Sequence, residues 1–254
     1  MNYNITNLKN NIRLASCTID TVESATVGIW VDIGARYENT SNNGISHFLE
    51  HMVFKGTETR TAKQIAAEIE NVGGYMNAYT TNETTAFYVK VLKDDIELGF
   101  EILSDMLLNS IFTDIEKEKQ VVLQEISQVY DNPADIVFDY FLSHCYCDQK
   151  LGQTVLGTPE VVTSITKEDL YSYLKNYFAN KKIVIAVAGN CNHEALLQYA
   201  EKYFTRHIEE RTDTLIPEAG FYNPDNFTEK RSEIALHNRD CDSRRDVIPT
   251  TNTV

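Results

Sequence analysis

The stretch Gly44–Thr57, GISHFLEHMVFKGT, decides how this sequence folds and what chemistry it can carry. Its apolar residues recur at i, i+3, i+4, i+7 and i+8, which predicts an amphipathic helix with one stripe facing the core. The residues of that stripe are Ile45, Phe48, Leu49, Met52 and Val53. The neighbouring stripe of the same helix holds His47, Glu50 and His51.

His47 and His51 indicate a metal site. Side chains four apart share one helix face, with Cβ atoms roughly 5–6 Å apart, and two such imidazoles can converge on one ion at Zn–N distances of about 2.0–2.1 Å. Glu50 stands beside that ion without binding it, in the position of a general base, and His-x-x-Glu-His is the inverted form of a zinc-peptidase motif. The alternative is a solvated polar face, but apolar residues flank the motif on both sides and favour the metal.

A third ligand is expected in residues 112–130, FTDIEKEKQVVLQEISQVY. Glu118 and Glu125 interrupt a helical line that otherwise consists of Ile115, Val122 and Val129. A buried carboxylate needs a compensating cation, since leaving it unpaired costs several kcal/mol. One of the two can bind the metal while the other orients a ligating imidazole. The alternative is that both glutamates lie on an exposed helix edge.

The rest of the chain predicts an α+β fold, a mixed or antiparallel sheet packed against helices. We expect strands over 11–18, 25–33, 75–80, 84–91 and 183–189, and helices over 61–73, 94–109, 114–130, 134–145, 166–178 and 192–204. Strands close in sequence are expected to form antiparallel pairs. Residues 1–208 are predicted to form the metal-binding domain, and 209–254 a linker with the truncated start of a second half, because Pro and Gly punctuate the chain from about 209.

Composition excludes several classes of function. With 23 Lys and Arg against 37 Asp and Glu, the net charge is −14, which argues against nucleic acid. The negative charge either serves solubility or attracts basic peptides into an acidic cavity. No apolar stretch is long enough to span a membrane, and no targeting signal is visible. Five scattered cysteines fit a reducing compartment, so we expect a cytoplasmic protein.

Three segments together closely resemble the M16, or pitrilysin-type, zinc metallopeptidases, especially mitochondrial processing peptidase and its bacterial relatives. They are residues 34–61 (GARYENTSNNGISHFLEHMVFKGTETRT), 70–89 (ENVGGYMNAYTTNETTAFYV) and 114–133 (DIEKEKQVVLQEISQVYDNP). The likeness extends over about residues 5–205 and suggests a bacterial origin. It implies that the chain is one half of such an enzyme.

The resemblance also implies roles for individual residues. His47, His51 and Glu125 would bind one Zn²⁺ per chain, while Glu50 and Glu118 would be the catalytic carboxylates, one as base and one in support. The strand at 75–80 resembles the family's edge strand, which binds an extended substrate by strand addition. Its expected substrate contacts are Asn77, Ala78 and Tyr79.

The expected function is therefore that of a zinc-dependent endopeptidase, cleaving extended peptides or presequence-like segments. Members of the family resemble a clam shell of two similar halves, on one chain or on separate subunits, and this sequence offers one half. We expect the chain alone to bind zinc and to hydrolyse peptides poorly unless a second M16-type half is supplied. The alternatives are a non-catalytic subunit with the same fold and a truncated inactive product.

Overall fold

A computed structural model describes residues 2–177 and 183–204. Its core is one six-stranded sheet in the order β1-β2-β6-β3-β5-β4. The strands are β1 (Asn2–Asn7), β2 (Arg13–Thr18), β3 (Ser24–Val31), β4 (Tyr75–Thr80), β5 (Thr85–Leu92) and β6 (Ile183–Gly189). β2 and β6 are parallel and every other neighbouring pair is antiparallel. The predicted mixed sheet packed against helices is confirmed.

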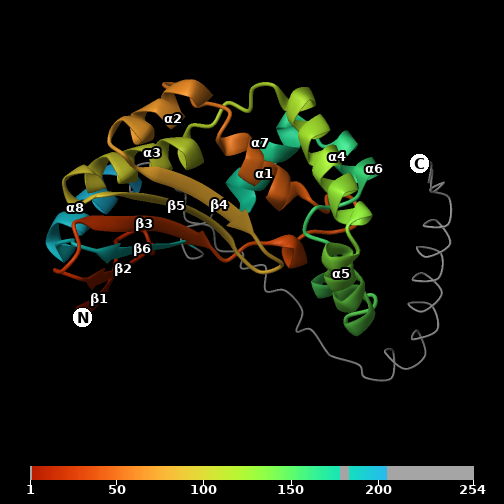
Figure 1. The fold of residues 1–254 in the computed structure, drawn as a ribbon, viewed down its shortest axis with the longest axis horizontal. Coiled ribbons are helices and arrows are strands. Elements are labelled where there is room, and N and C mark those ends of the chain that lie inside the picture. Colours follow the sequence, from red (N-terminus) through yellow and green to blue (C-terminus); the bar gives the residue numbers. More distant parts are fainter. Residues whose placement is uncertain (1, 178–182, 205–254) are drawn as a thin grey trace, which may run out of the picture.

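The described helices cover one face of this sheet and extend past one of its ends. They are α1 (Ile45–Val53), α2 (Ala62–Asn71), α3 (Ile96–Leu108), α4 (Ile115–Asp131), α5 (Pro133–Cys145), α6 (Pro159–Ser164), α7 (Lys167–Tyr177) and α8 (His193–Phe204), with short 3-10 turns at Ala35–Tyr37, Lys93–Asp95 and Lys150–Gly152. Figure 1 shows α2, α3 and α8 on one face of the sheet, and α1 beside α4. No described helix is long and apolar enough to cross a membrane.

The expected antiparallel pairing of the first two predicted strands, 11–18 and 25–33, is wrong. β6 lies between β2 and β3 and pairs with both. The link between β2 and β3 instead crosses the end of β6: the N–H of Ile19 donates to the carbonyl of Gly189, and the N–H of Asn190 donates to the carbonyl of Ser24. A central strand must satisfy main-chain groups on both edges, so β6 takes a place that sequence proximity does not reveal. The second predicted pair, β4 with β5, is correct.

Two short elements were not predicted. β1 contains three asparagines, which strands disfavour, and its apolar residues Tyr3 and Ile5 are 72% and 74% exposed. It forms because its main chain pairs with β2. α6 begins with Pro159 at its first turn, capped by the Thr158 hydroxyl, a helix-start signal that the sequence did contain. The predicted boundary at 208 and the segment 209–254 lie outside the described residues.

The apolar stripe of α1 anchors the functional helix in the core, as predicted. Each of its five residues is at most 2% exposed: Ile45, Phe48, Leu49, Met52 and Val53. α1 packs against the ends of β4 and β5 and against α4 and α7. The neighbouring stripe therefore faces α4 and the end of β4 from a fixed position.

Candidate metal centre

The first turn of α1 is held by a buried carboxylate that sequence analysis missed. Glu38 is fully buried and accepts hydrogen bonds from the main-chain N–H groups of Gly44 (2.7 Å) and Ser46 (2.8 Å) and from the Asn43 amide (2.9 Å). A carboxylate at a helix N-terminus satisfies free N–H groups and complements the helix dipole. Glu38 thus fixes the start of the helix that presents His47.

A close approach between two glycines fixes the same helix from the side. Gly44 has φ +93°, and a Cβ there would lie 2.6 Å from the carbonyl oxygen of Leu156. Gly157 has φ +76°, and a Cβ there would lie 2.3 Å from the carbonyl oxygen of Asn43. Only glycine tolerates both demands without strain. The segment that follows α5 is therefore packed directly against the start of α1.

His47, His51 and Glu125 converge although they come from two helices. Glu125 Oε2 lies 3.6 Å from His47 Nε2 and 3.5 Å from His51 Nε2. Donor atoms of the three residues all lie within 4.8 Å of one another. Ligands about 2.1 Å from a tetrahedral zinc ion are separated by about 3.4 Å. The donor set and its spacing therefore fit zinc.

The state of His47 supports that fit. The ring is almost completely buried, and burial, helped by the nearby His51, lowers its pKa to about 3. It is therefore neutral at physiological pH and keeps a lone pair, which a metal ligand needs. Its buried Nδ1 has no hydrogen-bond partner within the described chain. The lone pair of Nε2, 3.6 Å from Glu125 Oε2, is therefore available to a cation.

Glu118 contacts the second imidazole. Its Oε1 lies 2.9 Å from His51 Nδ1, and its Oε2 forms an ion pair with Lys55 Nζ at 2.6 Å. Glu118 is 5% exposed; burial alone would raise the pKa of this carboxyl, but Lys55 and His51 hold it below its usual value. An ionised carboxylate fixes the ring so that Nε2 faces Glu125. Sequence analysis missed Lys55, although it lies one helical turn after His51.

Glu50 lies beside the three donors and has a hydrogen-bond partner of its own. The Thr80 hydroxyl, from the end of β4, donates to Glu50 Oε2 at 2.7 Å. Burial raises the pKa of Glu50, and the bond from Thr80 only partly opposes this. A carboxyl with a raised pKa both accepts and returns a proton more readily near neutral pH. Thr80 was not among the predicted contacts.

A cavity of about 420 Å³ gives access to these groups. His47, Glu50 and Glu125 form one side, the end of β4 forms another, and α4, α5 and residues 154–156 complete it. Of the predicted substrate contacts, Ala78 and Tyr79 line the cavity. Asn77 does not line it, and its amide instead donates to the Tyr75 hydroxyl at 2.8 Å. β4 is an edge strand, as predicted, and pairs with β5 on its other side.

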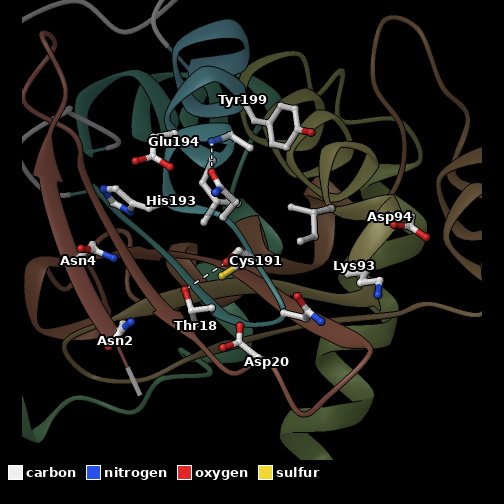
Figure 2. Close-up of a pocket in the computed structure, with 15 residues that line it drawn as sticks. Asn2, Asn4, Thr18, Asp20, Lys93, Asp94, Cys191, His193, Glu194 and Tyr199 are labelled. Atoms are coloured by element: carbon white, nitrogen blue, oxygen red, sulfur yellow. Dashed lines mark hydrogen bonds between the residues drawn. The ribbon is translucent and has the colours of Figure 1, made fainter.

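A second, larger cavity of about 660 Å³ lies near the first turn of α8 (Figure 2). His193, which lines this cavity, has both ring nitrogens within hydrogen-bond distance of hydroxyls, from Thr6 at 2.9 Å and Ser16 at 2.8 Å. Within residues 2–177 and 183–204 the cavity contains no cluster of three metal-ligating groups. His193 therefore links β1 and β2 to α8.

Comparison with known proteins identifies the family of the chain. A family model described as Insulinase (Peptidase family M16) matches residues 13–159, and one described as Peptidase M16 inactive domain matches residues 164–235. An uncharacterized zinc protease of Rickettsia felis is 40% identical over 234 residues, which cover 91% of this chain and 57% of that protein. The yeast mitochondrial-processing peptidase subunit beta is 44% identical over 199 residues, covering 78% and 43%.

Solved structures show the same fold. A protease from Helicobacter pylori superposes with a TM-score of 0.78 at 21% identity, covering 87% of this chain and 54% of its own. The chain spans about half the length of the curated relatives that it matches. More than half of it is matched by the first family model. The chain therefore belongs to peptidase family M16, the insulinase family.

Proposed function

We propose that this chain is the metal-binding half of a zinc-dependent endopeptidase, with one Zn²⁺ held by His47, His51 and Glu125. The observation that carries the proposal is the convergence of these three donors beside Glu50, in a cavity that also contains the end of an edge strand. Relatives named as zinc proteases support the choice of metal.

The chain's own residues supply positioning and proton transfer. Zinc, when bound, contributes Lewis-acid activation of water and of the scissile carbonyl. Glu50 accepts a proton from the attacking water and returns it to the leaving amine. Thr80 holds Oε2 of that carboxylate, which leaves Oε1 for the proton. Glu118 keeps the His51 ring in place throughout.

Extended peptides are the proposed substrates, because β4 is the edge strand of the sheet that the described residues form, lies beside Glu50 and can pair with an added strand. Presequence-like segments are a candidate class, suggested by the relatives named as mitochondrial-processing peptidase. A second M16-type half is the proposed partner. A cytoplasmic location in a bacterium stays a prediction.

Glu50→Gln tests the assignment of the base. The variant should bind one zinc per chain like the wild type, because Glu50 is not a ligand, and its peptide hydrolysis should fall by about 10²–10⁴-fold. Zinc content by metal analysis and cleavage of a fluorogenic basic peptide, with and without a chelator, measure both. Glu116→Gln is the matched control, since that side chain is 78% exposed on α4 and pairs with Lys119.

The same assay separates the alternatives. A non-catalytic subunit of the same fold is the second candidate, favoured by the match of residues 164–235 to a family model described as Peptidase M16 inactive domain. Full hydrolysis by Glu50→Gln would show that another group is the base. Hydrolysis that is absent from the wild type, even with a second half added, would favour the non-catalytic subunit.

A further inference from the structure

β1 is an edge strand that lacks the features which normally keep an edge from pairing. Natural sheets protect their edges with charged residues, prolines or bulges. β1 contains no charged residue and no proline, and its six residues pair with β2 in one continuous register, without a bulge. Within residues 2–177 and 183–204, β2 is the one strand that pairs with it. The outer edge of β1 can therefore accept a further strand.

The two apolar side chains of β1 are exposed on one face of the sheet. Tyr3 and Ile5 are 72% and 74% exposed, more than any other large apolar residue of the described chain. Residues two apart in a strand lie on the same face. Thr6 belongs to the opposite face, where its hydroxyl contacts the His193 ring of α8 at 2.9 Å. Tyr3 and Ile5 therefore lie on the face away from α8, where side chains of an added strand would cover them.

The order of residues in β1 suits pairing with a second copy of the same strand. In such a pair, a two-fold axis perpendicular to the sheet relates two antiparallel strands and makes their contacts reciprocal. With the axis at Asn4, Tyr3 of each copy lies opposite Ile5 of the other. With the axis at Ile5, Tyr3 would lie opposite Asn7 instead. Aromatic and β-branched side chains stabilise a sheet when they face each other across strands, so the axis at Asn4 is favoured.

Charged groups at the two ends of β1 favour the same arrangement. The larger cavity, which Asn2 lines, is also lined by three carboxylates and one ammonium group, those of Asp20, Asp94, Glu194 and Lys93 (Figure 2). At the other end, Lys9 follows the strand and Arg13 lies opposite Asn7, and both basic side chains are exposed. Antiparallel pairing places the basic end of each strand beside the acidic end of its copy. This complementarity opposes the repulsion between two chains of net charge −14.

We propose that β1 is a dimerisation surface, on which β1 of a second copy of this chain pairs antiparallel about Asn4. The two six-stranded sheets then continue across the two-fold axis, while β4 lies at the other edge of each sheet and leaves the candidate metal centres accessible. One pair of short strands provides less contact area than the about 1,200–2,000 Å² of a stable interface, so the dimer should dissociate readily on dilution. Pairing through β1 requires neither zinc nor substrate, and is therefore independent of the proposed function.

Sedimentation velocity of the full chain over a concentration series measures this dimer. Asn4→Asp and Asn4→Lys each place two like charges opposite each other at the two-fold axis. The dissociation constant of the dimer should therefore rise at least about tenfold in both variants. An equimolar mixture of the two variants places opposite charges across the axis, and it should dimerise at least as tightly as the wild type.

Asn77→Asp is the matched control, because it adds the same charge to an exposed asparagine of the other edge strand, β4. Its dimer should have the dissociation constant of the wild type. Asn4 is exposed as well, and circular dichroism with urea unfolding checks that each variant folds. Recovery of the dimer in the mixture would show in addition that both Asn4 variants keep a competent β1.

Three results would exclude this dimer. The first is a wild-type chain that stays monomeric up to its highest soluble concentration. The second is a dimer that the Asn4 variants leave unchanged, or that Asn77→Asp weakens as much as they do, because the interface would then lie elsewhere. The third is loss of the dimer in both Asn4 variants without recovery in their mixture, because the two copies of Asn4 would then not face each other.

Discussion

Lys55 balances the charge of Glu118, the carboxylate that contacts His51 in the candidate metal site. Lys55→Met removes the ammonium that pairs with Glu118 and leaves that carboxylate buried and free to turn away from His51. Zinc affinity should fall about tenfold, the lower end for partners of a metal ligand, in competition titration with a chromophoric chelator. Lys55→Arg should restore most of it.

Lys119→Met is the control for that experiment. Its ammonium pairs with Glu116 at 2.8 Å on the same helix and is not in contact with the three donors. Zinc affinity should therefore match the wild type. Equal affinities in Lys55→Met and Lys119→Met would show that Glu118 holds His51 without help.

The metal-free protein should lose stability in weak acid because of His47. Burial, then the nearby His51, lowers the pKa of His47 from 6.5 to about 3. Between these pKa values the unfolded chain binds a proton that the folded chain does not. The contribution of neutral His47 to the free energy of unfolding is therefore complete above pH 6.5 and is lost as pH falls toward 3. The loss should be about 1.4 kcal/mol per pH unit between about pH 6 and 4.

Urea unfolding of wild type and His47→Gln, both with chelator, measures this loss as a difference. Glu38 and Glu50 also titrate, with raised pKa values, but they are present in both proteins and their effects largely cancel in the comparison. The free energy of unfolding of His47→Gln should depend less steeply on pH below 6.5 than that of the wild type. Identical dependences would mean that His47 does not resist protonation in the folded state.

At the residue scale, the sequence could predict the candidate ligands, Glu50 and one supporting carboxylate, Glu118, but not the other supporting contacts. His47, Glu50 and His51 are visible because one helix spaces them. Glu38, Lys55 and Thr80 act through contacts that depend on the fold: Glu38 precedes the helix that it caps, and Thr80 reaches Glu50 from another element. The sequence contains these residue types in many places, and nothing local marks the three that matter.

At the scale of elements, β4 presents a main-chain donor at its free edge. The N–H of Ala78 donates to the side chain of its own neighbour Asn77 at 2.9 Å, not to β5. Ala78→Pro should remove this donor while leaving the ladder with β5 intact, since edge strands tolerate proline there. Peptide affinity of the zinc-loaded Glu50→Gln chain should fall about tenfold, the cost of one lost hydrogen bond.

Ala78→Gly is the matched control, because it removes only the methyl group and keeps the N–H. Anisotropy should report affinity close to that of the parent chain. Zinc binding and urea unfolding should be similar in all three proteins. If Ala78→Pro binds peptides as well as Ala78→Gly does, the substrate does not pair with this edge.

The periodicity of apolar residues predicts a helix or strand well where one of its faces is buried. It predicts poorly where main-chain pairing determines whether a strand forms and where it lies in the sheet. α1 follows from its buried stripe, and β4 with β5 from a short polar turn between two strands. The place of β6 between β2 and β3 depends on residues more than 150 positions apart in sequence. β1 forms on an edge with its apolar residues exposed, so its composition gives little sign of a strand.

At the scale of the whole molecule, the candidate site lies open on one side. α5, which contributes to the cavity, buries little of its surface within the described chain. On the sheet face opposite α2, α3 and α8, no helix of the described chain is packed (Figure 1), and Tyr75 in β4 is 56% exposed. Water exclusion strengthens the electrostatic interactions on which proton transfer by Glu50 depends. A cover over the cavity would exclude this water.

A second M16-type half is the cover that we expect, and its addition tests the proposal. The purified chain should bind zinc but hydrolyse a fluorogenic peptide slowly. Adding the C-terminal half of the Rickettsia felis relative should raise kcat/KM at least about tenfold. The reason is that closing a site both orients the substrate and excludes water. The same addition to Glu50→Gln should give no increase, which separates true complementation from a contaminating protease. Rapid hydrolysis by the chain alone, unchanged by the added half, would show that the open cavity is already a complete active site.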